Sequence, residues 1–114
     1  MHILSALQTT VAGKGNCQIY TKSYTGTGTY NVNNPSKLTF PGKPELVFIG
    51  GMTDAAFLVA FYGQTLAATQ STTNVRVDVS WSGNTMSWYS NTNALGQLNT
   101  QGTQYLVVAL ISQS

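Results

Sequence analysis

Charged residues are few in this chain of 114 residues, which carries five basic and three acidic side chains. An ordinary globular domain has about a quarter charged residues, so this surface must be hydrated in another way. Serine, threonine, asparagine and glutamine together supply 43 residues, whose hydroxyls and amides serve that purpose. Neutral polar surfaces of this kind are common on extracellular adhesion proteins and virion proteins. The scattered basic residues form no stripe that follows a phosphate backbone, which argues against nucleic-acid binding.

Cysteine and histidine occur once each, as Cys17 and His2. A single cysteine excludes an intrachain disulfide and argues against a cysteine-built metal site. Neither a Ser-His-Asp nor a Cys-His arrangement can be assembled without His2 at the chain terminus. The acids Glu45, Asp54 and Asp78 are scattered, whereas a glycosidase needs two carboxylates facing each other across the scissile bond. We therefore expect no enzyme, no cofactor and no metal site within one chain, although a metal on a symmetry axis between subunits remains open.

Long hydrophobic segments are also missing. No stretch approaches the 18 apolar residues that suggest a membrane span, so we expect no membrane insertion. The N-terminal sequence MHILSALQTTVAG lacks the basic flank and long apolar core of a signal peptide. Residues 1–16 are expected to form a connector or capping segment, with a short helix as one form. Residues 17–114 are expected to form a single domain.

The stretch KLTFPGKPELVFIGG, residues 37–51, is the centre of the expected fold. Two apolar runs, residues 38–40 and 46–49, lie on either side of Pro-Gly-Lys-Pro, which ends a regular element because proline lacks a backbone donor. They predict strands at residues 38–40 and 45–50. The second run is short and rich in branched and aromatic residues. This pattern predicts a central strand covered on both faces. Residues 55–62 are apolar throughout and predict a buried strand, with a short buried helix as the alternative.

Alternation of side chains predicts the other strands. The side chains of residues 17–25 alternate between two faces, with Tyr20, Lys22 and Tyr24 on one face. The alternation is clearer in residues 75–81. Together with residues 85–89, this segment predicts a β-hairpin around Ser-Gly-Asn. Residues 105–112 predict a fully apolar strand. We expect loops at residues 66–74 and 90–104, the second pinned by Leu95 and Leu98. The expected class is all-β, an antiparallel β-sandwich of about six to eight short strands.

Sugar binding requires little charge, because aromatic faces stack on pyranose rings while amides and hydroxyls bond to the sugar hydroxyls. The best local concentration of such groups begins at the end of the hairpin and includes Trp88, Tyr89, Asn91 and Asn93. A further candidate edge lies at the end of the apolar run 55–62, with Tyr62 and Gln64. These six residues are the candidate ligand-binding residues. The alternative for Trp81 and Trp88 is packing in the core or between subunits. Tyr89, on the opposite face from Trp88, is then the exposed aromatic. Tyr20, Tyr24 and Tyr30 offer another exposed face, unless they are ordinary half-buried tyrosines.

The order of these features resembles the C-terminal domains of phage and prophage tail proteins. The resemblance rests on a strand running into YTGTG, on NPSKLTFPGKPELVFIGG, on the WSGNTMSWYS hairpin and on the final LNTQGTQYLVVALI, and it covers residues 17–112. The matching positions are mostly turn formers and core residues, so they indicate a fold family more than an activity.

The resemblance implies a β-sandwich at a fibre or baseplate tip, usually in a homotrimer, that attaches to the host. The expected partners are further copies of the chain and a bacterial cell-surface glycan or envelope receptor. The expected location is the virion, or the extracellular space after lysis. Two alternatives stay open: a structural trimerisation or baseplate module without a ligand, and a carbohydrate-binding module of a cellular protein. The short stretch before the domain differs from the long shaft of a tail fibre.

Overall fold

Residues 17–112, which a computed structural model describes, contain eight β-strands and no helix. The strands are β1 (Gln18–Thr25), β2 (Ser36–Thr39), β3 (Lys43–Gly51), β4 (Phe57–Phe61), β5 (Leu66–Gln70), β6 (Asn74–Ser82), β7 (Thr85–Tyr89) and β8 (Gln104–Ser112). The all-β class is therefore confirmed. The short helix considered for the connector falls in residues 1–16, outside the described residues.

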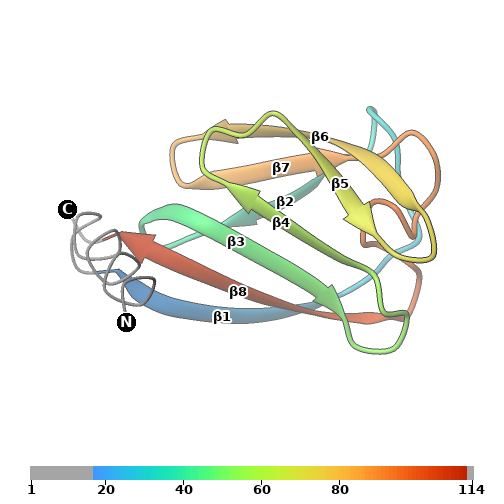
Figure 1. Ribbon diagram of the computed structural model, residues 1–114, viewed down its shortest axis with the longest axis horizontal. Coiled ribbons are helices and arrows are strands. Elements are labelled where there is room, and N and C mark those ends of the chain that lie inside the picture. The colour runs from blue at the N-terminus through green and yellow to red at the C-terminus, as the bar shows by residue number, and fades with distance from the viewer. Residues whose placement is uncertain (1–16, 113–114) are drawn as a thin grey trace, which may run out of the picture.

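The strands form one curled antiparallel sheet in the order β1-β8-β3-β4-β5-β6-β7-β2. A single residue pair, Phe57 with Gln70, joins β4 to β5, so the sheet folds over at this line. The halves β1-β8-β3-β4 and β5-β6-β7-β2 then enclose the core between them, and Figure 1 shows the curl of the sheet, with β2 drawn behind β4. The edge strands β1 and β2 lie at the side of the sandwich where the halves are not joined.

The core fills the space between the halves with every second side chain of the strands. Its largest fully buried members are Trp88, Tyr105, Ile49, Leu58, Met86 and Leu98. The clear alternation predicted for β6 is confirmed, because Val75, Val77 and Val79 are all buried. The predicted hairpin is also confirmed, and Gly83 occupies its turn with φ of +58°, a conformation that favours glycine.

Strands β3 and β4 differ from the prediction of burial on both faces. Strand β3 is central, between β8 and β4, but only its inward residues such as Val47 and Ile49 are buried. On β4, Leu58 and Ala60 are buried whereas Phe61 is 61% exposed. Each apolar run thus has one face in the core and a second apolar face on the surface. Continuous hydrophobicity in the sequence cannot distinguish such a strand from one that is buried on both faces.

The observed start of β3 also differs from the predicted start at residue 45. The strand begins at Lys43 and includes the buried Pro44, two residues before the predicted start. A shift in register against β8 between Pro44 and Leu46 accommodates the proline, which cannot donate a ladder hydrogen bond.

Residues 66–74 do not form the expected loop. Leu66 to Gln70 make up β5, which pairs with β6 along its whole length. The buried Thr69 hydroxyl donates a 2.6 Å hydrogen bond to the Gly96 carbonyl oxygen. The small and polar side chains of β5 give no strand pattern in the sequence, so the strand was not predicted. Its stability comes from backbone pairing and one buried hydroxyl.

The loop at residues 90–103 is pinned as predicted by Leu95 and Leu98, which pack against the core. It also carries two buried amides that the prediction omitted, Gln97 and Asn99. A Cβ on Gly26 would collide with the backbone of Thr100, so glycine is needed where the two loops meet. This close contact fixes the loop after β1 against the loop before β8.

Candidate functional site

Trp88 is 1% exposed and faces the core from β7. Its indole N–H donates a 2.8 Å hydrogen bond to the Gln97 carbonyl oxygen. The alternative in which Trp88 packs in the core is the one observed, and Tyr89 on the opposite face is partly exposed. Trp81 is half-buried, and its indole donates to the carbonyl oxygen of Gln64 at 2.8 Å.

Tyr89 and Asn91 do lie together, around a hollow of about 320 Å³ that Arg76, Asp78 and Thr92 complete. Asp78 is the direct neighbour of Tyr89 across the β6–β7 ladder. The Arg76 guanidinium contacts the Asp78 carboxylate at 3.1 Å within one strand. We call this depression the Tyr89 hollow.

Hydrogen bonds hold Asn91 and Thr92, which line the Tyr89 hollow, in place. The Asn91 side-chain oxygen accepts a 3.2 Å hydrogen bond from the backbone N–H of Val32, which ties the loop after β7 to the loop before β2. Thr92 donates its backbone N–H to the Ser90 hydroxyl at 3.1 Å. An aromatic ring, an amide, a carboxylate and a guanidinium thus border one depression, a set that suits a neutral polyhydroxylated ligand.

Asn93 is not part of the hollow. Its side-chain oxygen accepts a 2.7 Å hydrogen bond from the backbone N–H of Gly96, closing a turn in the loop. Asn93 therefore shapes the backbone around Leu95 and Leu98.

Tyr62 and Gln64 form a separate edge at the end of β4. The Tyr62 ring packs on Trp81 at 5.0 Å between ring centroids, and the Lys43 ammonium lies 4.9 Å from the Tyr62 centroid. Gln64 uses both ends of its amide locally: it accepts from the Phe61 N–H at 3.0 Å and donates to the Leu66 carbonyl at 2.8 Å. Gln64 thus closes the turn between β4 and β5, and neither Tyr62 nor Gln64 lines the Tyr89 hollow.

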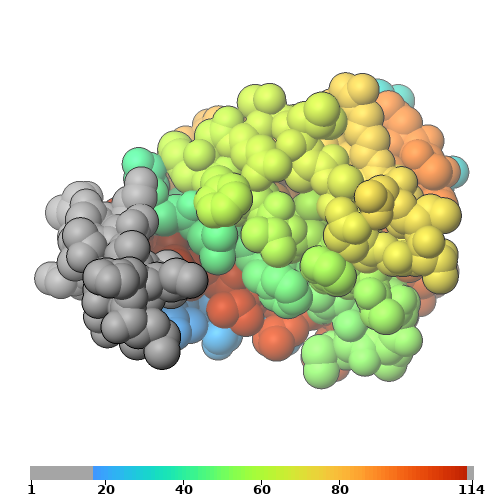
Figure 2. Space-filling model, in the orientation of Figure 1, coloured from blue at the N-terminus to red at the C-terminus, as the bar shows by residue number. Residues whose placement is uncertain are grey.

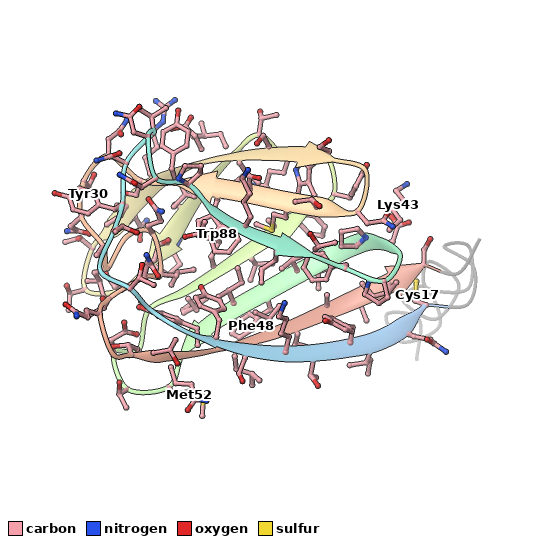
Figure 3. The ribbon with its side chains drawn as sticks, turned by 180° about the vertical axis from the view of Figure 1, so that it is seen from behind. Cys17, Tyr30, Lys43, Phe48, Met52 and Trp88 are labelled. Carbon is pink, nitrogen blue, oxygen red and sulfur yellow. The ribbon has the colours of Figure 1, made fainter. Side chains whose placement is uncertain are left out.

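A second depression, which was not predicted from the sequence, lies between the edge strands β1 and β2. We call it the β1–β2 cleft; it measures about 290 Å³, and its lining includes Lys22, Tyr24, Thr27, Thr29, Lys37 and Asn99. Trp88 forms part of its floor, and Figure 3 shows that residue in the gap between the blue β1 and the teal β2. The signal was available in the alternation that placed Lys22 between Tyr20 and Tyr24 on one face.

A tyrosine pair backs one end of the β1–β2 cleft. Tyr24 stacks on Tyr105 with ring centroids 5.1 Å apart, and its hydroxyl donates to the Leu98 carbonyl at 2.9 Å. The Tyr105 hydroxyl donates to the Asp54 carboxylate at 3.0 Å and accepts from the Thr100 N–H at 3.0 Å. Burial raises the pKa of both phenols above the ordinary tyrosine value, and the nearby Asp54 charge acts in the same direction.

The three carboxylates of the described residues each have a local partner. Glu45 lies 3.6 Å from the Lys43 ammonium, and Asp78 pairs with Arg76. Asp54 caps a turn, accepting a hydrogen bond from the Ala56 N–H at 3.1 Å. Only Asp78 lines the Tyr89 hollow, so that hollow has no second carboxylate for glycoside hydrolysis. Over residues 17–112, no group of three or more histidine, cysteine, aspartate or glutamate side chains is placed to hold a metal ion.

The outward side of the β1-β8-β3-β4 half carries a continuous set of apolar side chains, which we call the outer apolar face. Cross-strand pairing places Phe61, Leu46, Leu110 and Ile19 in one row and Val59, Phe48 and Val108 in the next. Phe57 and Leu106 extend it further, on either side of Gly50. Ile19 and Phe61 are 73% and 61% exposed. Figure 2 shows β3, β4 and β8 side by side on this side of the molecule.

Comparisons with protein-family models, with curated proteins and with solved structures found no match. In the part of the chain that the structure describes, no helix is long and apolar enough to cross a membrane.

Proposed function

We propose that this chain is a non-enzymatic receptor-binding domain of a phage tail-like particle, which recognises a bacterial cell-surface glycan as a homotrimer. The observation that carries the glycan part is the Tyr89 hollow, where an aromatic ring lies beside the Asn91 amide and the Arg76–Asp78 pair. Sugars are bound by this combination of an apolar ring face and planar polar groups. The link to tail proteins rests on the sequence resemblance alone.

The outer apolar face supports self-association. Nine apolar side chains cover adjacent strands, and the positions opposite one another across the ladders there include no charged residue. An exposed apolar patch of this continuity is typical of a protein–protein contact. In the proposed trimer this face contacts neighbouring subunits, which leaves the Tyr89 hollow, on the other half of the sandwich, open to ligand.

A purely structural module is the second candidate. The same outer apolar face supports it, because burial of that face alone would suffice for a trimerisation or baseplate role. The two candidates differ in one respect: a structural module needs no ligand at the Tyr89 hollow.

Binding of the purified full chain to an array of bacterial envelope polysaccharides tests the proposal. We expect retention of the chain on at least one polysaccharide and displacement by the free sugar. Absence of binding to every polysaccharide and to intact bacterial envelopes would favour the structural module.

A further inference from the structure

The charges of the β1–β2 cleft are unbalanced. Four basic side chains lie within residues 17–112, and two of them, Lys43 and Arg76, are paired with carboxylates. The other two, Lys22 and Lys37, both line the β1–β2 cleft, whose lining contains no carboxylate. The unpaired positive charge of the described chain is therefore gathered around one depression.

The carboxylates are held elsewhere. The one associated with the back of the cleft, Asp54, is engaged by the Tyr105 hydroxyl and the Ala56 N–H. Glu45 and Asp78 are each bound to their own cation. Lys22 and Lys37 line one cleft, so an anion within it is attracted by both positive charges.

The neutral groups of the cleft complete the site. The hydroxyls of Thr27 and Thr29 lie 3.0 Å apart on the exposed rim, and each retains capacity for a further hydrogen bond. Asn99 fixes them: its amide nitrogen donates to the Thr27 hydroxyl and the Thr29 carbonyl, both at 2.8 Å. The rim is thus held in place by a buried amide.

The backbone N–H groups of Thr27 and Gly28 are already hydrogen-bonded within the protein, so they do not contribute to an anion site. The N–H of Thr27 donates to the Asn99 side chain at 3.0 Å, and the N–H of Gly28 donates to the Asn99 carbonyl at 2.7 Å. The Thr-Gly-Thr-Gly sequence is therefore no phosphate loop, in agreement with the absence of a following helix. An oxyanion in the cleft is therefore bound by side chains, with the lysines supplying charge, while the threonine hydroxyls are placed to bond to neighbouring sugar hydroxyls.

We propose that the β1–β2 cleft is a second ligand site, which binds the carboxylate or phosphate of an acidic saccharide. Lys22 and Lys37 contact the oxyanion, and Thr27 and Thr29 bond to the adjacent hydroxyls. This site is separate from the Tyr89 hollow, where Arg76 is neutralised by Asp78. It stands on the cleft alone and does not require the proposed function.

Titration of the ¹⁵N-labelled full chain with glucuronic acid, glucose 1-phosphate and glucose tests this site. We expect at least one of the acidic sugars to shift the amide resonances of Thr27 and Thr29, and glucose to leave them in place. A response to glucuronic acid alone assigns the carboxylate, and a response to glucose 1-phosphate alone assigns the phosphate. Equal shifts with glucose, or no shift with any of the three, would overturn the proposal.

Three lysine variants make the test specific. Lys22→Gln and Lys37→Gln should each weaken binding of the acidic sugar about threefold to tenfold, as expected for loss of one partly exposed charge contact. Lys43→Gln, which removes a lysine of the same type outside the cleft, should leave binding unchanged. Tyr89→Ala should also leave it unchanged, which separates this site from the first. Equal affinity of Lys22→Gln, Lys37→Gln and the unmodified chain would contradict the assignment.

Discussion

At the scale of single residues, the Gln97 side chain makes four hydrogen bonds that no sequence pattern predicted. Its fully buried amide donates to the Asn34 carbonyl at 2.7 Å and to the Ser36 hydroxyl at 3.2 Å. Its side-chain oxygen accepts from the backbone N–H groups of Asn31 and Ser90, at 3.0 and 2.9 Å. One glutamine in the loop after β7 thus joins that loop to the loop before β2 and to the first residue of β2.

Gln97→Ala should lower the free energy of unfolding by about 3 kcal/mol or more, because it leaves several buried polar groups without partners. Urea unfolding followed by tryptophan fluorescence measures this change. Gln101→Ala, at an exposed position of the same loop, is the matched control and should change stability by less than about 0.5 kcal/mol. Similar stabilities of the two variants would refute the structural role of Gln97.

The buried phenols predict a dependence of stability on pH. Tyr24 and Tyr105 have raised pKa values in the folded chain, so the unfolded chain loses these protons first as the pH increases. Their contribution to stability is fully present below the unfolded tyrosine pKa of about 10 and is lost as the pH rises above it. Melting temperature should therefore fall as the pH rises above about 10.

Tyr24→Phe should make that alkaline fall shallower. At pH 7 the same change costs about 1 kcal/mol, since it removes the hydrogen bond to the Leu98 carbonyl. Tyr30→Phe, at a partly exposed loop position, serves as the control and should keep the unmodified pH profile. An unchanged profile for Tyr24→Phe would show that this phenol does not control alkaline stability.

At the scale of elements, β5 depends on one buried hydroxyl. Thr69→Val keeps the shape of the side chain but removes the donor to the Gly96 carbonyl oxygen. We expect a loss of about 1–2 kcal/mol in unfolding free energy, because that carbonyl becomes unsatisfied. Thr72→Val, in the exposed turn after β5, should be nearly neutral. Thermal unfolding of the two variants distinguishes them, and equal melting temperatures would contradict this account of β5.

The elements that sequence predicted well are those whose two faces differ in polarity. Strand β6 alternates valines with polar residues, and the hairpin turn has the required glycine, so local chemistry and final structure agree. Strand β5 carries no such alternation, and β4 is apolar on a face that is only partly covered. Their pairing and exposure depend on neighbours distant in the sequence.

The candidate site was predictable only in part. Tyr89 and Asn91 were found because an aromatic residue and amides follow one another where a strand enters a loop. Arg76 and Asp78 join them through β6–β7 pairing. Alternation in residues 17–25 placed Lys22 on one face of β1, but no local pattern shows that this face meets β2, an edge strand from the opposite end of the sheet order.

At the scale of the whole molecule, the outer apolar face predicts self-association. Light scattering on the purified chain should give three times the mass of the 12.2 kDa chain. Val59→Arg, in the middle of that face, should shift the protein toward monomer, because the charge would have to be buried in the contact. Val32→Arg, at an exposed loop position, should not alter the mass. A monomer for the unmodified chain would contradict the trimer.

Recognition of a glycan through the Tyr89 hollow is the central claim, and one comparison tests it most directly. The affinity of the full chain for the envelope polysaccharide that it binds best is measured by calorimetry before and after Tyr89→Ala, with Tyr30→Ala as the matched control. Loss of the ring should weaken binding about tenfold, corresponding to about 1.4 kcal/mol of stacking, while melting temperature and the control affinity stay unchanged. Equal affinities of Tyr89→Ala and the unmodified chain would place the glycan elsewhere and contradict the assignment.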